Sequence, residues 1–137
     1  MDQTFGVSHL KEEDFKAEGL RDYALYRDLG VTAATGGLAR AHVIRLKPPY
    51  PAEAGLEHYH TVDFQMVYVL QGWIRNRFEG QGEFLMLKGS CWVQPPGIRH
   101  AVLGYSDDCE LLEVILPAEF DTVTLESLPG AAAGQPK

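Results

Sequence analysis

The stretch GLEHYHTVDFQMVYVLQGW (residues 55–73) places two histidines, two residues apart, in a run rich in valine, tyrosine and leucine. Side chains two apart on a β-strand point to the same face. We therefore expect His58 and His60 on one face, where their imidazole nitrogens can converge on one ion at about 2.1 Å each. Gln65 interrupts the apolar run that follows, and a buried amide there requires a polar partner.

A third histidine strengthens the case for a metal. His100 follows Pro95, Pro96 and Gly97, which predict a rigid reversal that fixes the entry of the next strand. A single histidine is more often a surface residue or a hydrogen-bonded core residue than a ligand. Two histidines on one strand, a third after a rigid turn and a buried amide together favour a metal site.

The rest of the chain predicts an all-β protein. Short runs rich in β-branched and aromatic residues recur between glycines and prolines, which is typical of an antiparallel sandwich or barrel. The expected strands lie within residues 21–30, 38–46, 64–72, 73–80, 83–89, 90–95, 100–104 and 109–117. Gly80 and Gly82 predict a hairpin turn around Gln81. Residues 11–18 favour one short helical turn.

Length and composition limit the function. A chain of 137 residues suits one domain, and a net charge of -7 disfavours binding to nucleic acid. No apolar run reaches the roughly 18 residues of a membrane span, and the N-terminus lacks the pattern of an export signal, so we expect a cytoplasmic protein. Cys91 and Cys109 are expected to be free thiols.

Two motifs resemble those of the cupin superfamily. The pattern His58-x-His60-x4-Gln65-x6-Gly72 is similar to the first cupin motif, and Gly89-x5-Pro95-x-Gly97-x2-His100 is similar to the second. The sixteen residues between the motifs resemble the short connection of compact bacterial single-domain cupins. The resemblance implies a double-stranded β-helix, the cupin jelly-roll barrel. It also implies a metal held by His58, His60, Gln65 and His100.

The resemblance also divides the chain. The barrel core is expected at residues 38–117, preceded by a segment, 1–37, with one or two added strands. Residues 118–128 form a C-terminal extension, and we expect 129–137 (PGAAAGQPK) to be disordered because its composition cannot hold a packed structure. Exposed strand edges and the family resemblance predict a homodimer that exchanges N-terminal strands.

Gln65 stands where cupins most often carry glutamate. Three neutral imidazoles and a neutral amide leave the full +2 charge on the ion, which favours anionic ligands such as enolates or carboxylates. A nitrogen-rich site suits a divalent transition metal, with iron expected first and zinc, nickel or manganese as alternatives. Gln65 either binds the metal directly or hydrogen-bonds a bound water.

Two functions follow from such a site. The first is an enzyme that acts on a small oxygen-rich molecule, with Fe(II) as a dioxygenase similar to three-histidine cupin dioxygenases. The alternative is a non-enzymatic cupin that binds or senses a small molecule, because the motifs contain no evident general base. The partner is a small molecule in both cases.

Other residues have less decided roles. A structural role is favoured for His42, and Glu113 either orients a metal ligand or faces solvent. Phe64 and Trp92 are expected to fill the core or to line the cavity, with the core favoured, and Cys91 is expected in the core. If Gln65 faces inward, strand alternation places Val67 and Val69 inward, and Met66 and Tyr68 outward. In residues 73–78, either Trp73, Arg75 and Arg77 or Ile74, Asn76 and Phe78 line the interior.

Overall fold

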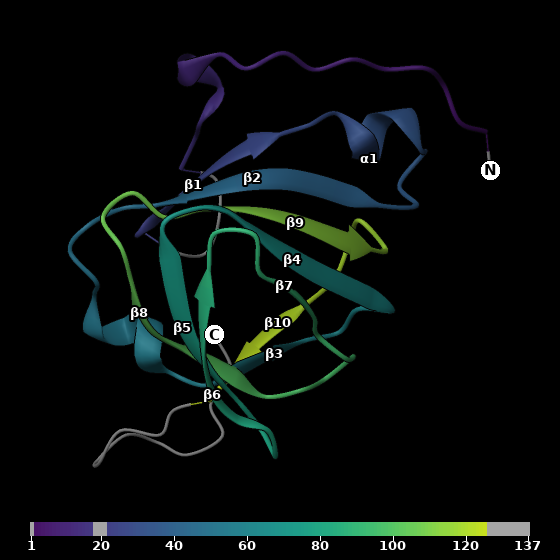
Figure 1. Cartoon of the computed structure of the whole chain (residues 1–137). Coiled ribbons are helices and arrows are strands. Elements are labelled where there is room, and N and C mark those ends of the chain that lie inside the picture. The colour runs from purple at the N-terminus through teal and green to yellow at the C-terminus, as the bar shows by residue number, and fades with distance from the viewer. Residues whose placement is uncertain (1, 18–21, 126–137) are drawn as a thin grey trace.

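Two five-stranded antiparallel sheets face each other in the computed structural model, which describes residues 2–17 and 22–125 (Figure 1). The first sheet contains, in order, β1 (Ala24–Asp28), β2 (Arg40–Leu46), β9 (Glu110–Leu116), β4 (Phe64–Gln71) and β7 (Cys91–Val93). The second contains β10 (Thr122–Thr124), β3 (His58–His60), β8 (His100–Tyr105), β5 (Trp73–Phe78) and β6 (Gly82–Leu87). The predicted all-β jelly roll is confirmed.

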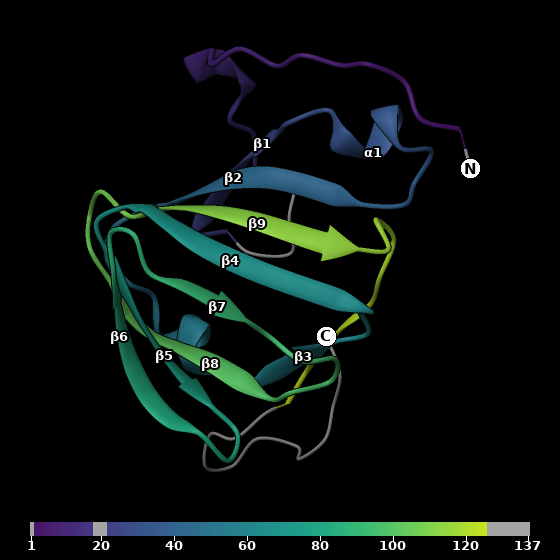
Figure 2. The same ribbon diagram turned by 45° about the vertical axis from the view of Figure 1, so that its right-hand side comes forward.

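Most strands that follow one another in the chain lie in opposite sheets. The chain passes from β2 to β3, back to β4, and across again to β5, and β7, β8, β9 and β10 alternate in the same way. Figure 2 shows the layers that result, with β2, β9, β4 and β7 as successive strands of the first sheet. Each sheet therefore presents its inner face to the other, and side chains from distant parts of the sequence meet between them.

Three short helical segments occur in the described residues, one before the first strand and two between strands. They are η1 (Glu12–Asp14), α1 (Val31–Ala34) and η2 (Ala52–Gly55). The first lies within the predicted helical turn, whereas α1 and η2 were not predicted, because four residues carry no periodic apolar face. None of these helices is long and apolar enough to cross a membrane.

The predicted strands of the barrel are present. The hairpin at Gly80 and Gly82 is confirmed, with φ angles of 73° and 94° between the paired strands β5 and β6. The segment expected at 1–37 contributes β1, and the extension at 118–128 contributes β10. The tail at 129–137 lies outside the described residues.

The apolar core fills one end of the barrel. Its buried side chains include Val69 near the end of β4, Ile74 at the start of β5, and Leu111 at the start of β9. Tyr105 at the end of β8 and Cys109 complete this end. Both cysteines are free, and burial raises the pKa of the Cys109 thiol to about 12. Toward their other ends these strands turn the polar side chains of Gln65, Asn76, His100 and Glu113 inward.

Gly72 joins the two sheets at the tight turn between β4 and β5. Its φ of +73° is unfavourable for residues with a Cβ, and an added Cβ would lie 2.1 Å from Ser106 Oγ and 3.1 Å from the backbone of Cys109. Ser106 Oγ cannot move freely, because it accepts a hydrogen bond from the backbone N–H of Trp73.

We expect Gly72→Ala to destabilise the fold more than Gly80→Ala. Gly80 has the same φ of +73° but no atom near the position of an added Cβ. The control should cost about 1 kcal/mol from the backbone alone, and Gly72→Ala about 2 to 4 kcal/mol because of the added clash. Denaturant unfolding measures both losses, and equal losses would contradict the role of the close contact.

Candidate metal centre

Three histidines meet on the inner face of the second sheet. His58 and His100 are cross-strand partners in the pairing of β3 with β8, and alternation along β3 places His60 on the same face. The three residues are 5, 7 and 6 % exposed for His58, His60 and His100. One ring nitrogen from each lies within 4.8 Å of those of the other two. Such a group can hold a metal ion.

Oxygen atoms behind the three rings set their orientation. Nδ1 of His58 lies 3.3 Å from the carbonyl oxygen of Leu56, and Nδ1 of His100 lies 3.1 Å from that of Ile98. Nδ1 of His60 lies 2.9 Å from the hydroxyl of Thr122 on β10. Because carbonyl oxygens only accept hydrogen bonds, these contacts assign the proton of His58 and of His100 to Nδ1 and leave the Nε2 lone pair of both rings available. The hydroxyl of Thr122 orients the ring of His60 and can donate or accept.

Gln65 lies opposite the histidines on the first sheet and is 2 % exposed. Its Nε2 donates a hydrogen bond of 2.7 Å to Oε2 of Glu113 on β9. The other carboxylate oxygen of Glu113 lies 2.7 Å from Nε2 of His42, its cross-strand partner on β2. Gln65 and Glu113 therefore both face the interior, and His42 supports Glu113.

Gln94 connects Gln65 to His100. Its Nε2 lies 3.3 Å from Oε1 of Gln65 and 3.0 Å from Nε2 of His100. Its Oε1 accepts a hydrogen bond of 3.0 Å from the indole N–H of Trp92. The N–H hydrogens of this amide, which carry partial positive charge, thus point toward acceptor atoms of Gln65 and His100 that a cation would also attract. The same amide nitrogen lies 3.2 Å from Nδ1 of His100, so it approaches the edge of this ring between its two nitrogens, and Oε1 of Gln65 faces the same side.

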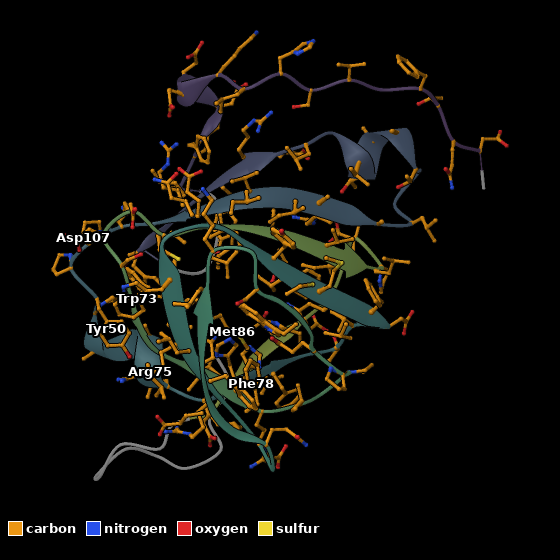
Figure 3. All side chains as sticks on the ribbon, in the orientation of Figure 1. Tyr50, Trp73, Arg75, Phe78, Met86 and Asp107 are labelled. Carbon is orange, nitrogen blue, oxygen red and sulfur yellow. The ribbon has the colours of Figure 1, made fainter. Side chains whose placement is uncertain are left out.

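Strand β5 turns its apolar and amide side chains inward. Ile74, Asn76 and Phe78 are buried, whereas Trp73 and Arg75 are exposed. In Figure 3, Trp73 and Arg75 lie on the outer side of β5, and Phe78 lies toward the middle of the barrel. The interior at this strand is therefore lined by Ile74, Asn76 and Phe78, and the arginines do not reach it.

Asn76 is unusual among these residues. It is 2 % exposed, and its Nδ2 has no hydrogen-bond partner among the described residues. Its cross-strand partners are Val102 on β8 and Phe84 on β6, and it is two residues from Phe78, which stacks on His100 with a centroid distance of 6.2 Å. A buried amide donor without a partner costs about 1 to 3 kcal/mol, so its presence requires a reason.

Some expectations for the side chains are wrong. Phe64 is 37 % exposed, and Cys91 is also exposed, although both were expected in the core. The reason is alternation: Gln65 faces inward, so Phe64 and Tyr68 face outward, and Cys91 pairs with Tyr68. Trp92, Val67 and Val69 face inward, and both valines are buried in the core cluster.

Sequence reasoning missed Gln94 and left the face of Asn76 open. The spacing of Trp92 and Gln94 was a usable signal. Residues two apart in an extended segment point to the same face, so a segment that turns Trp92 inward turns Gln94 inward as well. The face of Asn76 was undecided because β5 carries polar residues on both faces, so only its pairing with β8 settles it.

The fold of this chain is similar to solved structures of known proteins. The polyketide cyclase RemF from Streptomyces resistomycificus matches with a TM-score of 0.66 and 21% identity, over 90% of this chain and 89% of that one. A sugar phosphate isomerase of the cupin superfamily from Silicibacter pomeroyi matches with a TM-score of 0.60 and 20% identity, over 91% and 98%. This chain therefore has the cupin fold.

A larger protein shares the same fold over part of its length. Salicylate 1,2-dioxygenase from Pseudaminobacter salicylatoxidans matches with a TM-score of 0.60 and 14% identity, over 77% of this chain and 31% of that one. No protein-family model matches the chain, and no curated protein matches it in sequence. Likeness at this level of identity concerns the fold alone, since one fold carries unrelated activities.

Proposed function

We propose that this cupin-fold chain is a metal-dependent enzyme that acts on a small oxygen-rich organic molecule, most simply as a dioxygenase. The observation that carries the proposal is the buried group of His58, His60 and His100. In this proposal Gln65 is the fourth ligand, through Oε1. The contact of Gln94 Nε2 with Gln65 Oε1 supports that assignment, because it directs this oxygen to the side of His100.

The donor set fits a divalent transition metal. Three imidazole nitrogens and one amide oxygen suit Fe(II), Zn(II), Ni(II) or Mn(II) better than Ca²⁺ or Mg²⁺, which prefer several carboxylate oxygens. We propose iron as the working metal. Bound there, Fe(II) would supply the capacity to react with O2, and a zinc or nickel ion would act only as a Lewis acid. The alternative in which Gln65 bonds a coordinated water uses the same four residues.

The protein's own residues would position the substrate. The proposed ligands are neutral, so the site retains a net positive charge and attracts an enolate, phenolate or carboxylate oxygen. We propose that Nδ2 of Asn76 donates a hydrogen bond to a second oxygen of the same molecule, which would satisfy the donor that lacks a partner. Phe78 and Trp92, whose rings lie 6.1 Å apart, would exclude water from this part of the interior.

A second candidate function is binding or sensing without turnover. The carboxylate near the histidines, Glu113, already bonds Gln65 and His42, so it is poorly placed to move a substrate proton. This favours either O2 chemistry, which needs no general base in its first step, or no chemistry at all.

We further propose a cytoplasmic homodimer. Phe64, Tyr68, Leu70 and Val93 expose apolar surface on neighbouring strands β4 and β7, and β7 is an edge strand. In the described chain β1 pairs with β2 of the same chain, so the exchange of N-terminal strands remains a prediction. Sedimentation equilibrium should give twice the monomer mass, and Tyr68→Glu should shift the equilibrium to monomer because it places charge on this surface.

The metal site is tested by loading the metal-free protein with Fe(II) under anaerobic conditions. We expect one equivalent to bind, and His100→Ala to weaken binding by at least about 100-fold, because it removes a ligand. His9→Ala is the matched control, since His9 is exposed and distant in sequence from the motifs. Equal affinity of both variants would contradict the site.

Turnover is tested by oxygen consumption of the iron-loaded protein with a panel of diketones and catechols. At least one compound should drive oxygen uptake that His58→Ala abolishes and His9→Ala leaves unchanged. Compounds that bind with no uptake under iron, and no conversion under zinc, nickel or manganese, would support the binding function in place of the enzyme.

Asn76→Leu should separate stability from ligand binding. Leucine removes the buried donor that lacks a partner, so we expect the free energy of unfolding to stay equal or rise by about 1 kcal/mol. The affinity for a bound catechol or diketone should fall about tenfold, measured by calorimetry on the metal-loaded protein. A loss of stability with no change in affinity would assign Asn76 a structural role.

A further inference from the structure

We propose that Glu113 is a positioning residue that turns the amide of Gln65 so that its oxygen faces the histidines, and that this carboxylate makes glutamine the suitable residue at position 65. The inference rests on the proposed metal site. It is carried by a continuous series of hydrogen bonds that begins with the indole of Trp92 and ends on the carboxylate of Glu113. Gln94 and Gln65 form the middle of the series.

The first end of the series fixes Gln94. The indole Nε1–H of Trp92 can only donate a hydrogen bond, so the atom of Gln94 that it contacts at 3.0 Å must be the oxygen. The amide nitrogen of Gln94 then points the other way, toward Gln65. It contacts Gln65 at 3.3 Å and can only donate, so the atom it meets there must be Oε1 of Gln65.

The second end fixes Gln65 independently. An ionised carboxylate can only accept hydrogen bonds, and the atom of Gln65 that lies 2.7 Å from Glu113 must therefore be the amide nitrogen. The opposite orientation would place the amide oxygen against the carboxylate and the amide nitrogen against Nε2 of Gln94. Both ends of the series thus demand the same orientation, with Oε1 of Gln65 directed to the side of Gln94 and His100.

His42 holds the carboxylate in place. Its Nε2 lies 2.7 Å from Oε1 of Glu113, and the two residues are cross-strand partners, so the contact requires no strained side chain. The ring of His42 is itself packed at 5.0 Å from the ring of Tyr26 on β1. Each oxygen of Glu113 therefore has a donor, which leaves one orientation for the carboxylate and one for the amide.

This arrangement explains why a carboxylate is unsuitable at position 65. A glutamate there would place a second carboxylate about 2.7 Å from that of Glu113 in a buried site, where like charges repel strongly. In the native chain the negative charge instead lies one hydrogen bond away from the proposed metal. Its position polarises the amide of Gln65 and strengthens the oxygen as a donor to the ion.

The test exchanges the two functional groups. Four proteins are compared: the native chain, Gln65→Glu, Glu113→Gln, and the double variant that carries both changes. The double variant restores one amide and one carboxylate at the same separation, with the charge moved next to the metal. Denaturant unfolding of the four metal-free proteins measures the interaction between the side chains at positions 65 and 113. The affinities for Mn(II) and Zn(II) measure how this interaction affects the proposed metal site.

We expect strong coupling between the two positions. Gln65→Glu should raise the unfolding equilibrium constant at least about tenfold, because it juxtaposes two buried carboxylates, and the double variant should return to within about threefold of the native value. Glu113→Gln alone should weaken Zn(II) binding about 10- to 100-fold while one equivalent still binds at saturation. The double variant should bind Mn(II) more tightly relative to Zn(II) than the native chain does, because a carboxylate then contacts the ion.

Other outcomes separate this inference from the proposed function. Suppose that the native chain binds metal but the stability loss of the double variant equals the sum of the losses of the two single variants. That result would overturn the positioning role and leave the metal site in place. A native chain that binds no ion, with coupled stabilities, would overturn the proposed function and still support the oriented amide pair. If Gln65→Glu alone does not fold, a folded double variant supports the inference, and a double variant that also fails to fold overturns it.

Discussion

The candidate site depends on the antiparallel pairing of β3 with β8, which sets His58 directly opposite His100. A shift of one residue in this register would turn one of the two side chains to the outer face of the sheet. β10 pairs with β3 on its other side and brings Thr122 behind His60, so this third strand orients another histidine of the group. The site is therefore a consequence of sheet closure, and its precision depends on strands too short to be stable by themselves.

Burial of the polar side chains around the three histidines costs free energy because these groups lose their hydrogen bonds to water, and the apolar core around Val69 and Leu111 offsets part of that cost. Gln65, Gln94 and the three histidines are almost fully buried, and each has a hydrogen-bond partner. The hydrogen bonds among these side chains therefore compensate for most of the hydration that is lost on burial. The donor of Asn76 is the exception, because it is buried without a hydrogen-bond partner among the described residues, and in the proposed function a bound molecule supplies one. This pattern is common where stability is given up for function.

The sequence predicted the barrel and the histidine group well, because both rest on short-range rules. Strand alternation places His58 with His60, and a rigid turn before His100 limits where that residue can lie. The partner of Gln65 was beyond such rules. Glu113 lies 48 residues away, and its role depends on which strand pairs with β4. The outward positions of Phe64 and Cys91 followed from the same alternation that placed Gln65 inward, so an apolar side chain alone was a poor guide to burial.

A neutral amide at position 65 changes which ligands the site prefers, and the network shows how the change is sustained. In the proposed site, a carboxylate bonded to the metal would reduce the positive charge available to a substrate, whereas Glu113 would act through one intervening amide and leave the ion accessible to an anion. The same carboxylate also limits evolution of the site. Replacement of Gln65 by glutamate alone meets repulsion from Glu113, and replacement of Glu113 alone releases the orientation of the amide. A change to a site in which a glutamate at position 65 binds the metal therefore requires positions 65 and 113 to change together. The two residues thus determine the ligand preference of the proposed site jointly.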